Sequence, residues 1–73
     1  MRNYLRKLRK ERGLTQAQVA NSLGISQNYY SNIENGTRMK IMDLQLLDSI
    51  SALYEVSING LVQQELEILR KEA

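Results

Sequence analysis

Apolar residues recur along this chain at the three- and four-residue spacing of amphipathic helices, without the strict alternation that marks strands. The spacing predicts five helices, at about residues 3–12, 16–23, 27–35, 44–55 and 58–71. A glycine follows each of the first three segments, where a positive φ can end a helix. Residues suited to N-capping precede the second to fifth segments: Thr15, Ser26, Asp43 and Ser57. We therefore expect a single all-α domain over residues 1–73.

The second and third helices are separated by only three residues. Val19, Ala20 and Leu23 share one face of the second helix, and Tyr30 and Ile33 form the inner stripe of the third. The small side chain of Ala20 allows two helices that cross near a right angle to approach closely. This stretch predicts a helix-turn-helix motif, in which a tight turn joins two helices.

The outer face of the third helix is neutral, short-chained and rich in amides. Its residues are Gln27, Asn28, Tyr29, Ser31, Asn32 and Asn35. An amide both donates and accepts hydrogen bonds, which complements the adenine edge in the major groove of DNA. We therefore expect this helix to read bases.

The net charge of +2 conceals an asymmetry along the chain. Residues 1–12 carry six Arg or Lys and one Glu, a net +5, whereas residues 41–73 carry two basic and six acidic residues, a net −4. A chain with this polarity orients itself near a polyanion. Arg2, Arg6 and Lys10 line the polar face of the first helix, which is expected either near phosphates or in solvent.

The composition argues against catalysis. The chain has 73 residues, no Cys and no His, so it lacks thiolates and the commonest general base and metal ligand. Its Asp and Glu residues are scattered along the chain, and we expect them to act as solubilising surface charges. We expect no enzyme activity, no metal and no cofactor. No apolar run approaches the roughly 18 residues of a membrane span, so we expect a cytoplasmic protein.

Candidate phosphate contacts lie at two places. Backbone N–H groups at the start of the second helix can bind a phosphate oxygen, and Thr15 and Gln16 lie there. Thr15 also fits a reciprocal capping box with Gln18, and the two roles can coexist. Arg38 and Lys40 lie in the loop after the third helix, where they are expected either along the DNA backbone or free in solvent.

Several short stretches together resemble the helix-turn-helix repressors typified by phage repressor and Cro proteins, the XRE-like family. The resemblance covers about residues 3–63. It rests on Leu5, Leu8 and Arg9, then on Gly13-Leu14-Thr15-Gln16, Val19-Ala20, Leu23-Gly24-Ile25-Ser26, Ile33-Glu34-Asn35-Gly36 and residues 53–62. It implies a lambda-repressor-like fold of five helices that binds operator DNA as a homodimer.

The resemblance also implies roles for single residues. The family's phosphate-contacting positions fall here on Thr15, Gln16 and Asn35. Its base-reading positions fall on Gln27, Asn28 and Asn32, with Tyr29 and Ser31 beside them. Arg9 and Glu34 match a pair that ties the first helix to the third, so Arg9 is expected to be structural. Tyr30 departs from the usual β-branched residue, and its phenol must reach solvent or a partner if the ring is buried. The loop after the third helix lacks the family's usual Pro.

The C-terminal third of the chain carries two further apolar faces. The fourth helix is expected to turn inward with Leu44, Leu47, Ile50, Ser51 and Tyr54. In the family pattern Ile58 and Leu61 close the core. Beyond them Val62, Leu66 and Leu69 recur on one side of the last helix, and an apolar stripe of this kind predicts a dimer interface. Alternatively, the stripe packs on Leu46 and Leu53 of the same chain.

The sequence therefore predicts a sequence-specific DNA-binding transcriptional regulator, expected to be a repressor that binds a palindromic double-stranded operator. The alternative is a protein-interaction module on the same fold, such as an antitoxin or an anti-repressor. The protein-interaction hypothesis requires an apolar outer face on the third helix, and only Tyr29 suggests such a face. Neither a small-molecule site nor membrane contact is expected.

Overall fold

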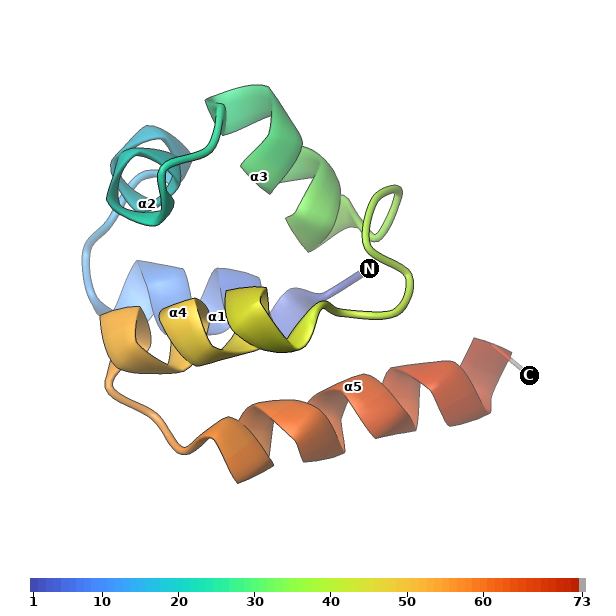
Figure 1. Ribbon diagram of the computed structural model, residues 1–73. Helices are drawn as coiled ribbons and strands as arrows, with labels where there is room; N and C mark the ends of the chain where they lie inside the picture. Colours follow the sequence, from blue (N-terminus) through green and yellow to red (C-terminus); the bar gives the residue numbers. More distant parts are fainter. Residues whose placement is uncertain (73) are drawn as a thin grey trace. The chain divides into compact units, whose positions relative to one another are not determined.

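The computed structural model describes residues 1–72. Within them the chain forms five helices and no strands (Figure 1). The helices are α1 (Asn3–Glu11), α2 (Gln16–Leu23), α3 (Gln27–Asn35), α4 (Leu44–Tyr54) and α5 (Ile58–Glu72). Their bounds lie within one residue of those that the apolar spacing predicts, and the all-α fold class is confirmed.

The chain divides into two compact units. The first unit, Met1–Lys40, contains α1, α2 and α3, and the second, from Ile41 onwards, contains α4 and α5. Each unit is described by itself below. The single domain expected over residues 1–73 stays a prediction.

Side-chain caps begin four of the helices, as the sequence predicts, and before α5 Ser57 Oγ accepts from the Asn59 backbone N–H at 3.2 Å. The capping box at α2 is complete, because Thr15 Oγ1 accepts from the Gln18 backbone N–H at 3.1 Å and the Thr15 N–H donates to Gln18 Oε1 at 2.8 Å. The side chains of Ser26 and Asp43 each accept from the backbone N–H three residues later, at 3.1 Å. These bonds satisfy N–H groups that have no partner within their own helix.

The core of the first unit consists of the inner faces of its three helices. Leu5 of α1, Val19 and Ala20 of α2, and Tyr30 and Ile33 of α3 are all buried. Each of them lies on the face that the helical projection predicts to be internal. The inner face of α3 is therefore covered within this unit, whereas Gln27, Asn28 and Asn35 of the same helix are exposed.

In the second unit Leu47, Ile50, Tyr54 and Leu61 are buried, as expected. Two inward predictions are wrong: Leu44 is 75% exposed, and Ile58 is exposed as well. Each is the first residue of its helix. Helical side chains lean towards the N-terminus of their helix, so a side chain at the first position projects past the helix end.

The helices of the described residues include none that is both long and apolar enough to cross a membrane.

Candidate nucleic-acid interface

A sharp turn of three residues joins α2 to α3. Gly24 has φ +72°, the left-handed conformation, and its N–H donates to Asn21 O at 3.2 Å. The next N–H, that of Ile25, donates to Ala20 O at 3.0 Å, which completes a Schellman motif. Ser26 then caps α3. Ala20 is buried and α2 packs against α3, so the motif is a helix-turn-helix (Figure 1).

The outer face of α3 carries the residues that the sequence predicts to read bases. Gln27 and Asn28, in the first turn, are exposed, whereas Tyr29, Ser31 and Asn32 are half-buried. Asn35, predicted to contact a phosphate, is exposed at the last position of the helix. The structure thus brings these polar side chains together on one helix. Their contacts with DNA stay predictions.

At the start of α2, the exposed Thr15 forms the capping box, and Gln16 is half-buried. The Gln16 amide Nε2 donates to Glu34 Oε1 at 3.2 Å. This bond links the first turn of α2 to the last turn of α3. The phosphate contacts expected of Thr15 and Gln16 stay predictions, and the bond to Glu34 fixes the position from which the Gln16 amide would make its contact.

Glu34 is the centre of a buried polar cluster. Its side chain is fully buried and forms an ion pair with Arg9, with Arg9 Nε 2.8 Å from Oε2 and Nη2 3.3 Å from Oε1. Arg9 also donates to the backbone oxygen of Leu14 at 3.1 Å. Burial acts to raise the pKa of the Glu34 carboxyl, but hydrogen bonds from Arg9, Tyr30 and Gln16 outweigh it and hold the pKa below its ordinary value.

This cluster accounts for the unusual Tyr30. The ring is fully buried and its hydroxyl bonds to Glu34, so the phenol has the partner that its burial requires. Among the described residues, no buried side-chain nitrogen or oxygen lacks a hydrogen-bond partner. The cluster therefore joins α1, α2 and α3 without the cost of an unpaired buried polar group.

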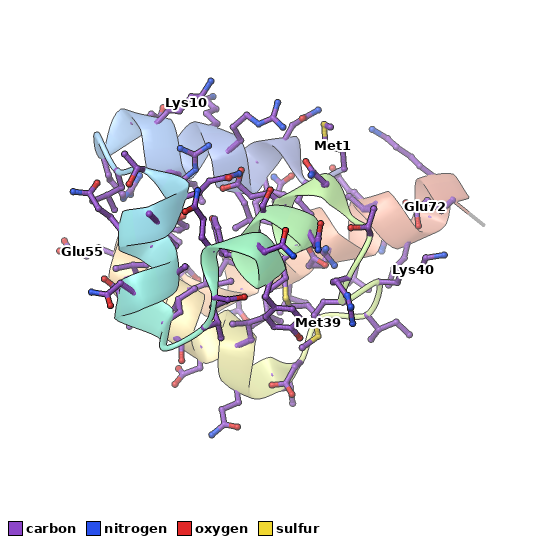
Figure 2. The ribbon with its side chains drawn as sticks, turned by 90° about the horizontal axis from the view of Figure 1, so that it is seen from above. Met1, Lys10, Met39, Lys40, Glu55 and Glu72 are labelled. Atoms are coloured by element: carbon purple, nitrogen blue, oxygen red, sulfur yellow. The ribbon has the colours of Figure 1, made fainter. Side chains whose placement is uncertain are left out.

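The first unit is strongly basic. Residues 1–40 carry eight Arg or Lys and two Glu, a net +6. Arg38 and Lys40, in the loop after α3, are exposed, as is Lys10 near the end of α1. Figure 2 labels Lys10 and Lys40. Arg6 is half-buried, with its Nε 4.0 Å from Glu34 Oε1. No group of His, Cys, Asp or Glu in the described part of the chain is placed to hold a metal ion.

Arg2 does not lie on the polar face where the helical projection placed it. It precedes α1 as the N-cap residue and is only 2% exposed. Its guanidinium donates to backbone oxygens at the end of α3 and in the following loop. The projection failed because it treats every position as helical and cannot tell which segment lies opposite a helix start. No signal in the sequence indicates this contact.

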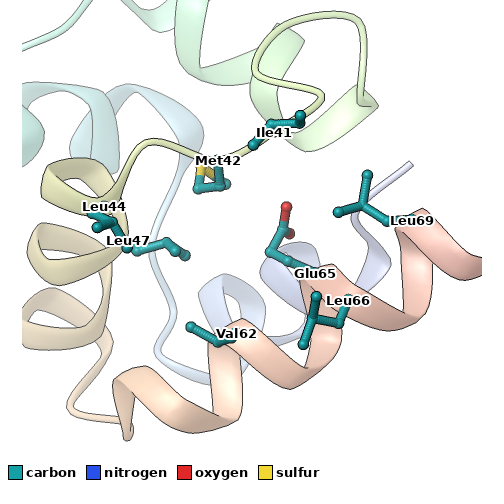
Figure 3. A pocket seen from close by; sticks show the side chains of 8 residues that line it. All are labelled: Ile41, Met42, Leu44, Leu47, Val62, Glu65, Leu66 and Leu69. Carbon is teal, nitrogen blue, oxygen red and sulfur yellow. The ribbon is translucent and has the colours of Figure 1, made fainter.

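The second unit carries an apolar groove of about 170 Å³ (Figure 3). Its lining includes the predicted interface residues Val62, Leu66 and Leu69, and across from them Leu44 and Leu47 of α4. Ile41, Met42 and Glu65 complete the lining. Ile41 is 77% exposed and Leu66 is 37% exposed. The groove is therefore bordered by large apolar side chains that the chain itself leaves uncovered. The sequence did not reveal the part that Ile41 plays in it.

Comparison with known proteins agrees with this geometry. The helix-turn-helix family model matches residues 5–61. An uncharacterised HTH-type transcriptional regulator of Bacillus subtilis, YqaF, is 53% identical over 38 residues, which cover 52% of this chain and 50% of YqaF. The ImmF control region 10 kDa protein of Bacillus phage phi105 is 33% identical over 63 residues, covering 86% of this chain and 68% of the phage protein.

The transcriptional regulator SinR of Bacillus subtilis is 29% identical over 63 residues, which cover 86% of this chain and 56% of SinR. The matches thus span about half of YqaF and of SinR. No solved structure matches. The family model covers most of the chain, from within α1 to the start of α5, and this range includes the capped turn between α2 and α3. The chain therefore belongs to the helix-turn-helix family.

Proposed function

We propose that this chain is a sequence-specific DNA-binding transcriptional regulator that inserts α3 into the major groove and acts as a repressor. The observation that carries the proposal is the exposed, amide-rich face of α3, with Gln27 and Asn28 in its first turn, on a unit of net charge +6. Recognition helices of this type contact base edges with their N-terminal residues. The HTH-type transcriptional regulators to which the chain is similar support the regulatory part of this proposal.

The proposal divides the polar residues into two groups. Gln27, Asn28 and Asn32, with Tyr29 and Ser31 beside them, contact base edges. Thr15, Gln16, Asn35, Arg38 and Lys40 contact phosphates. Base contacts determine which sequence is preferred, whereas phosphate contacts fix the position of the protein on the duplex and contribute affinity to every sequence.

The structure offers a way to test this proposal directly. The full chain is used in a binding selection on random DNA duplexes, beside an Asn28→Ala variant and a Gln64→Ala variant, whose change lies on an exposed position of α5. The wild type and the α5 control should recover the same operator, and Asn28→Ala should lose preference at one base pair. A wild-type pool without any enriched sequence would contradict sequence-specific binding and favour a protein-interaction module.

We further propose that the chain forms a homodimer through the groove of the second unit, with a second copy as the occupant. One helix-turn-helix covers a half-site, and symmetric recognition uses two half-sites about 34 Å apart. A dimer with a two-fold axis presents α3 to two equivalent half-sites, so the proposed homodimer corresponds to a palindromic operator.

A further inference from the structure

Arg2 joins the start of α1 to the end of α3 and to the loop that follows. Its backbone N–H donates to Glu34 O at 2.7 Å. Its guanidinium donates to Ile33 O at 2.8 Å, to Arg38 O at 3.2 Å and to Met39 O. Figure 1 shows the N-terminus of the chain beside this loop. Because Arg2 is only 2% exposed, its guanidinium is engaged inside the protein and is not presented to a phosphate.

Arginine is suited to this position for two reasons. The last carbonyl oxygens of a helix lack partners within the helix and carry a partial negative charge, so a cation stabilises them. A guanidinium has five N–H donors in a planar fork and can bond several carbonyl oxygens at once. The ammonium group of Lys is a compact point charge that cannot span the same set of acceptors.

The segment held by Arg2 carries two of the candidate phosphate contacts. Arg38 and Lys40, the residues before and after Met39, are both exposed, and Figure 2 labels Met39 and Lys40. Met39 has φ +56°, a left-handed conformation that residues with a Cβ adopt rarely and that needs support from the surrounding structure. The bonds from Arg2 to the carbonyl oxygens of Arg38 and Met39 supply such support. They fix the backbone between the two exposed cations relative to α3.

We propose that Arg2 is a positioning residue for DNA binding. It does not touch DNA, but it holds the loop so that Arg38 and Lys40 reach phosphates while α3 lies in the major groove. This inference rests on the proposed function. It makes a distinct claim, however, because binding by α3 can exist whether or not Arg2 orders the loop.

The test uses the salt dependence of binding by the full chain to a mixed-sequence DNA duplex, followed by fluorescence anisotropy. Each phosphate contact contributes about 0.9 to the slope of log affinity against log salt. Replacing both loop cations (Arg38→Gln with Lys40→Gln) should therefore reduce the slope by about 1.8. Arg2→Lys should reduce it by a similar amount, although it preserves the net charge. In the Arg2→Lys variant, adding the two loop substitutions should change the slope of log affinity against log salt little further.

Arg12→Lys is the matched control, since Arg12 is an exposed residue after the other end of α1. It should leave the slope unchanged. Binding is measured at a temperature at which circular dichroism shows every variant to be folded. A smaller slope of log affinity against log salt then cannot arise from unfolding. Arg2→Met, which removes the charge as well, gives a second variant if Arg2→Lys does not fold.

The outcomes separate the two proposals. If the wild type shows no salt-dependent binding to the duplex, both the proposed function and the role of Arg2 are overturned. If the wild type binds with a steep slope and Arg2→Lys matches it, DNA binding stands and the positioning role fails. The role also fails if the loop substitutions reduce the slope equally in the wild-type and Arg2→Lys backgrounds.

Discussion

The hydroxyl of Tyr30 bonds to the carboxylate of Glu34, one turn further along α3, and both side chains are fully buried. Arg9 and Gln16 bond to the same carboxylate from α1 and from the start of α2. The inner surface of the candidate recognition helix is therefore anchored by a charged cluster as well as by apolar contacts. Ile33, between Tyr30 and Glu34, supplies the apolar part of this anchor.

Tyr30→Phe should lower the free energy of unfolding by about 1 kcal/mol, because it removes one hydrogen bond to the carboxylate while it keeps the buried ring. Urea denaturation followed by circular dichroism measures the change. Tyr29→Phe, on the outer face of α3, serves as the control and should change stability little. Equal effects of the two substitutions would show that the Tyr30 hydroxyl contributes nothing to the cluster.

Glu34→Gln should reduce stability by about 1.5–3 kcal/mol at neutral pH, the range for hydrogen bonds to a charged group. The pKa of Glu34 is lowered in the folded protein from the ordinary value of 4.5, so its ionised form stabilises the fold above that pH. This contribution is lost as the pH falls through the lower pKa of the folded state. The difference in unfolding free energy between wild type and Glu34→Gln should therefore narrow on acidification.

Denaturation curves recorded between neutral and acidic pH check this dependence. Glu67→Gln, a change at an exposed carboxyl, is the control. The acid-induced loss of stability in Tyr30→Phe should begin at a higher pH than in the wild type, because one bond that lowers the pKa of Glu34 is absent. If the free energies of unfolding of wild type and Glu34→Gln differed by the same amount at every pH, the lowered pKa of Glu34 would be contradicted.

Gly36→Ala should destabilise the chain more than Gly24→Ala. Both glycines are in the left-handed conformation, at φ +81° and +72°, where a Cβ costs about 1–2 kcal/mol. At Gly36 the added Cβ would also lie 3.1 Å from the backbone nitrogen of Met1, whereas at Gly24 it would meet no atom within 4 Å. Thermal denaturation of the two variants provides the comparison, and a larger loss at Gly24 would refute the close approach of Met1.

Gln27→Ala and Gln16→Ala should weaken DNA binding in different ways. Loss of a base contact costs about 1–3 kcal/mol and relaxes the preference at one base pair. Loss of a phosphate contact weakens binding to all sequences alike. Affinities for the selected operator and for a scrambled duplex distinguish these outcomes. Identical losses for both variants on both duplexes would refute the assignment.

Leu66→Glu should shift a homodimer towards monomer, because it places a charge in the apolar groove of the second unit. Gln64→Glu introduces the same charge at an exposed position of α5 and is the matched control. Sedimentation velocity at several protein concentrations measures the oligomeric state, and denaturation tests whether each variant folds. A Leu66→Glu variant that dimerises like the control would rule out this groove as the interface.

The sequence predicted the helices well because their signals are local. Thr15, Ser26 and Asp43 act on N–H groups three residues away, and Gly24 supplies a conformation that other residues disfavour. The sequence was less reliable at helix starts. Leu44 and Ile58 fit the apolar spacing, yet both are exposed, because a periodic pattern does not register that a first-turn side chain projects beyond its helix.

The amide face of α3 was readable from the sequence alone, since an outer face follows directly from the position of the apolar stripe. The sequence indicated only some of the hydrogen-bond partners of the buried polar groups. The pairing of Arg9 with Glu34 was expected from a family resemblance, whereas the bonds that Tyr30 and Gln16 make to the same carboxylate became visible only in the structure.

What the sequence by itself determined is the set of helices, their caps and the chemical character of each face, because these depend on residues within one or two turns of each other. Only the tertiary structure decided that Arg2 is buried against the end of α3, and that Ile41 joins Val62 and Leu66 around one groove. These residues are far apart in the chain. Their proximity depends on how helices pack, and the periodicity within one helix carries no information about that packing.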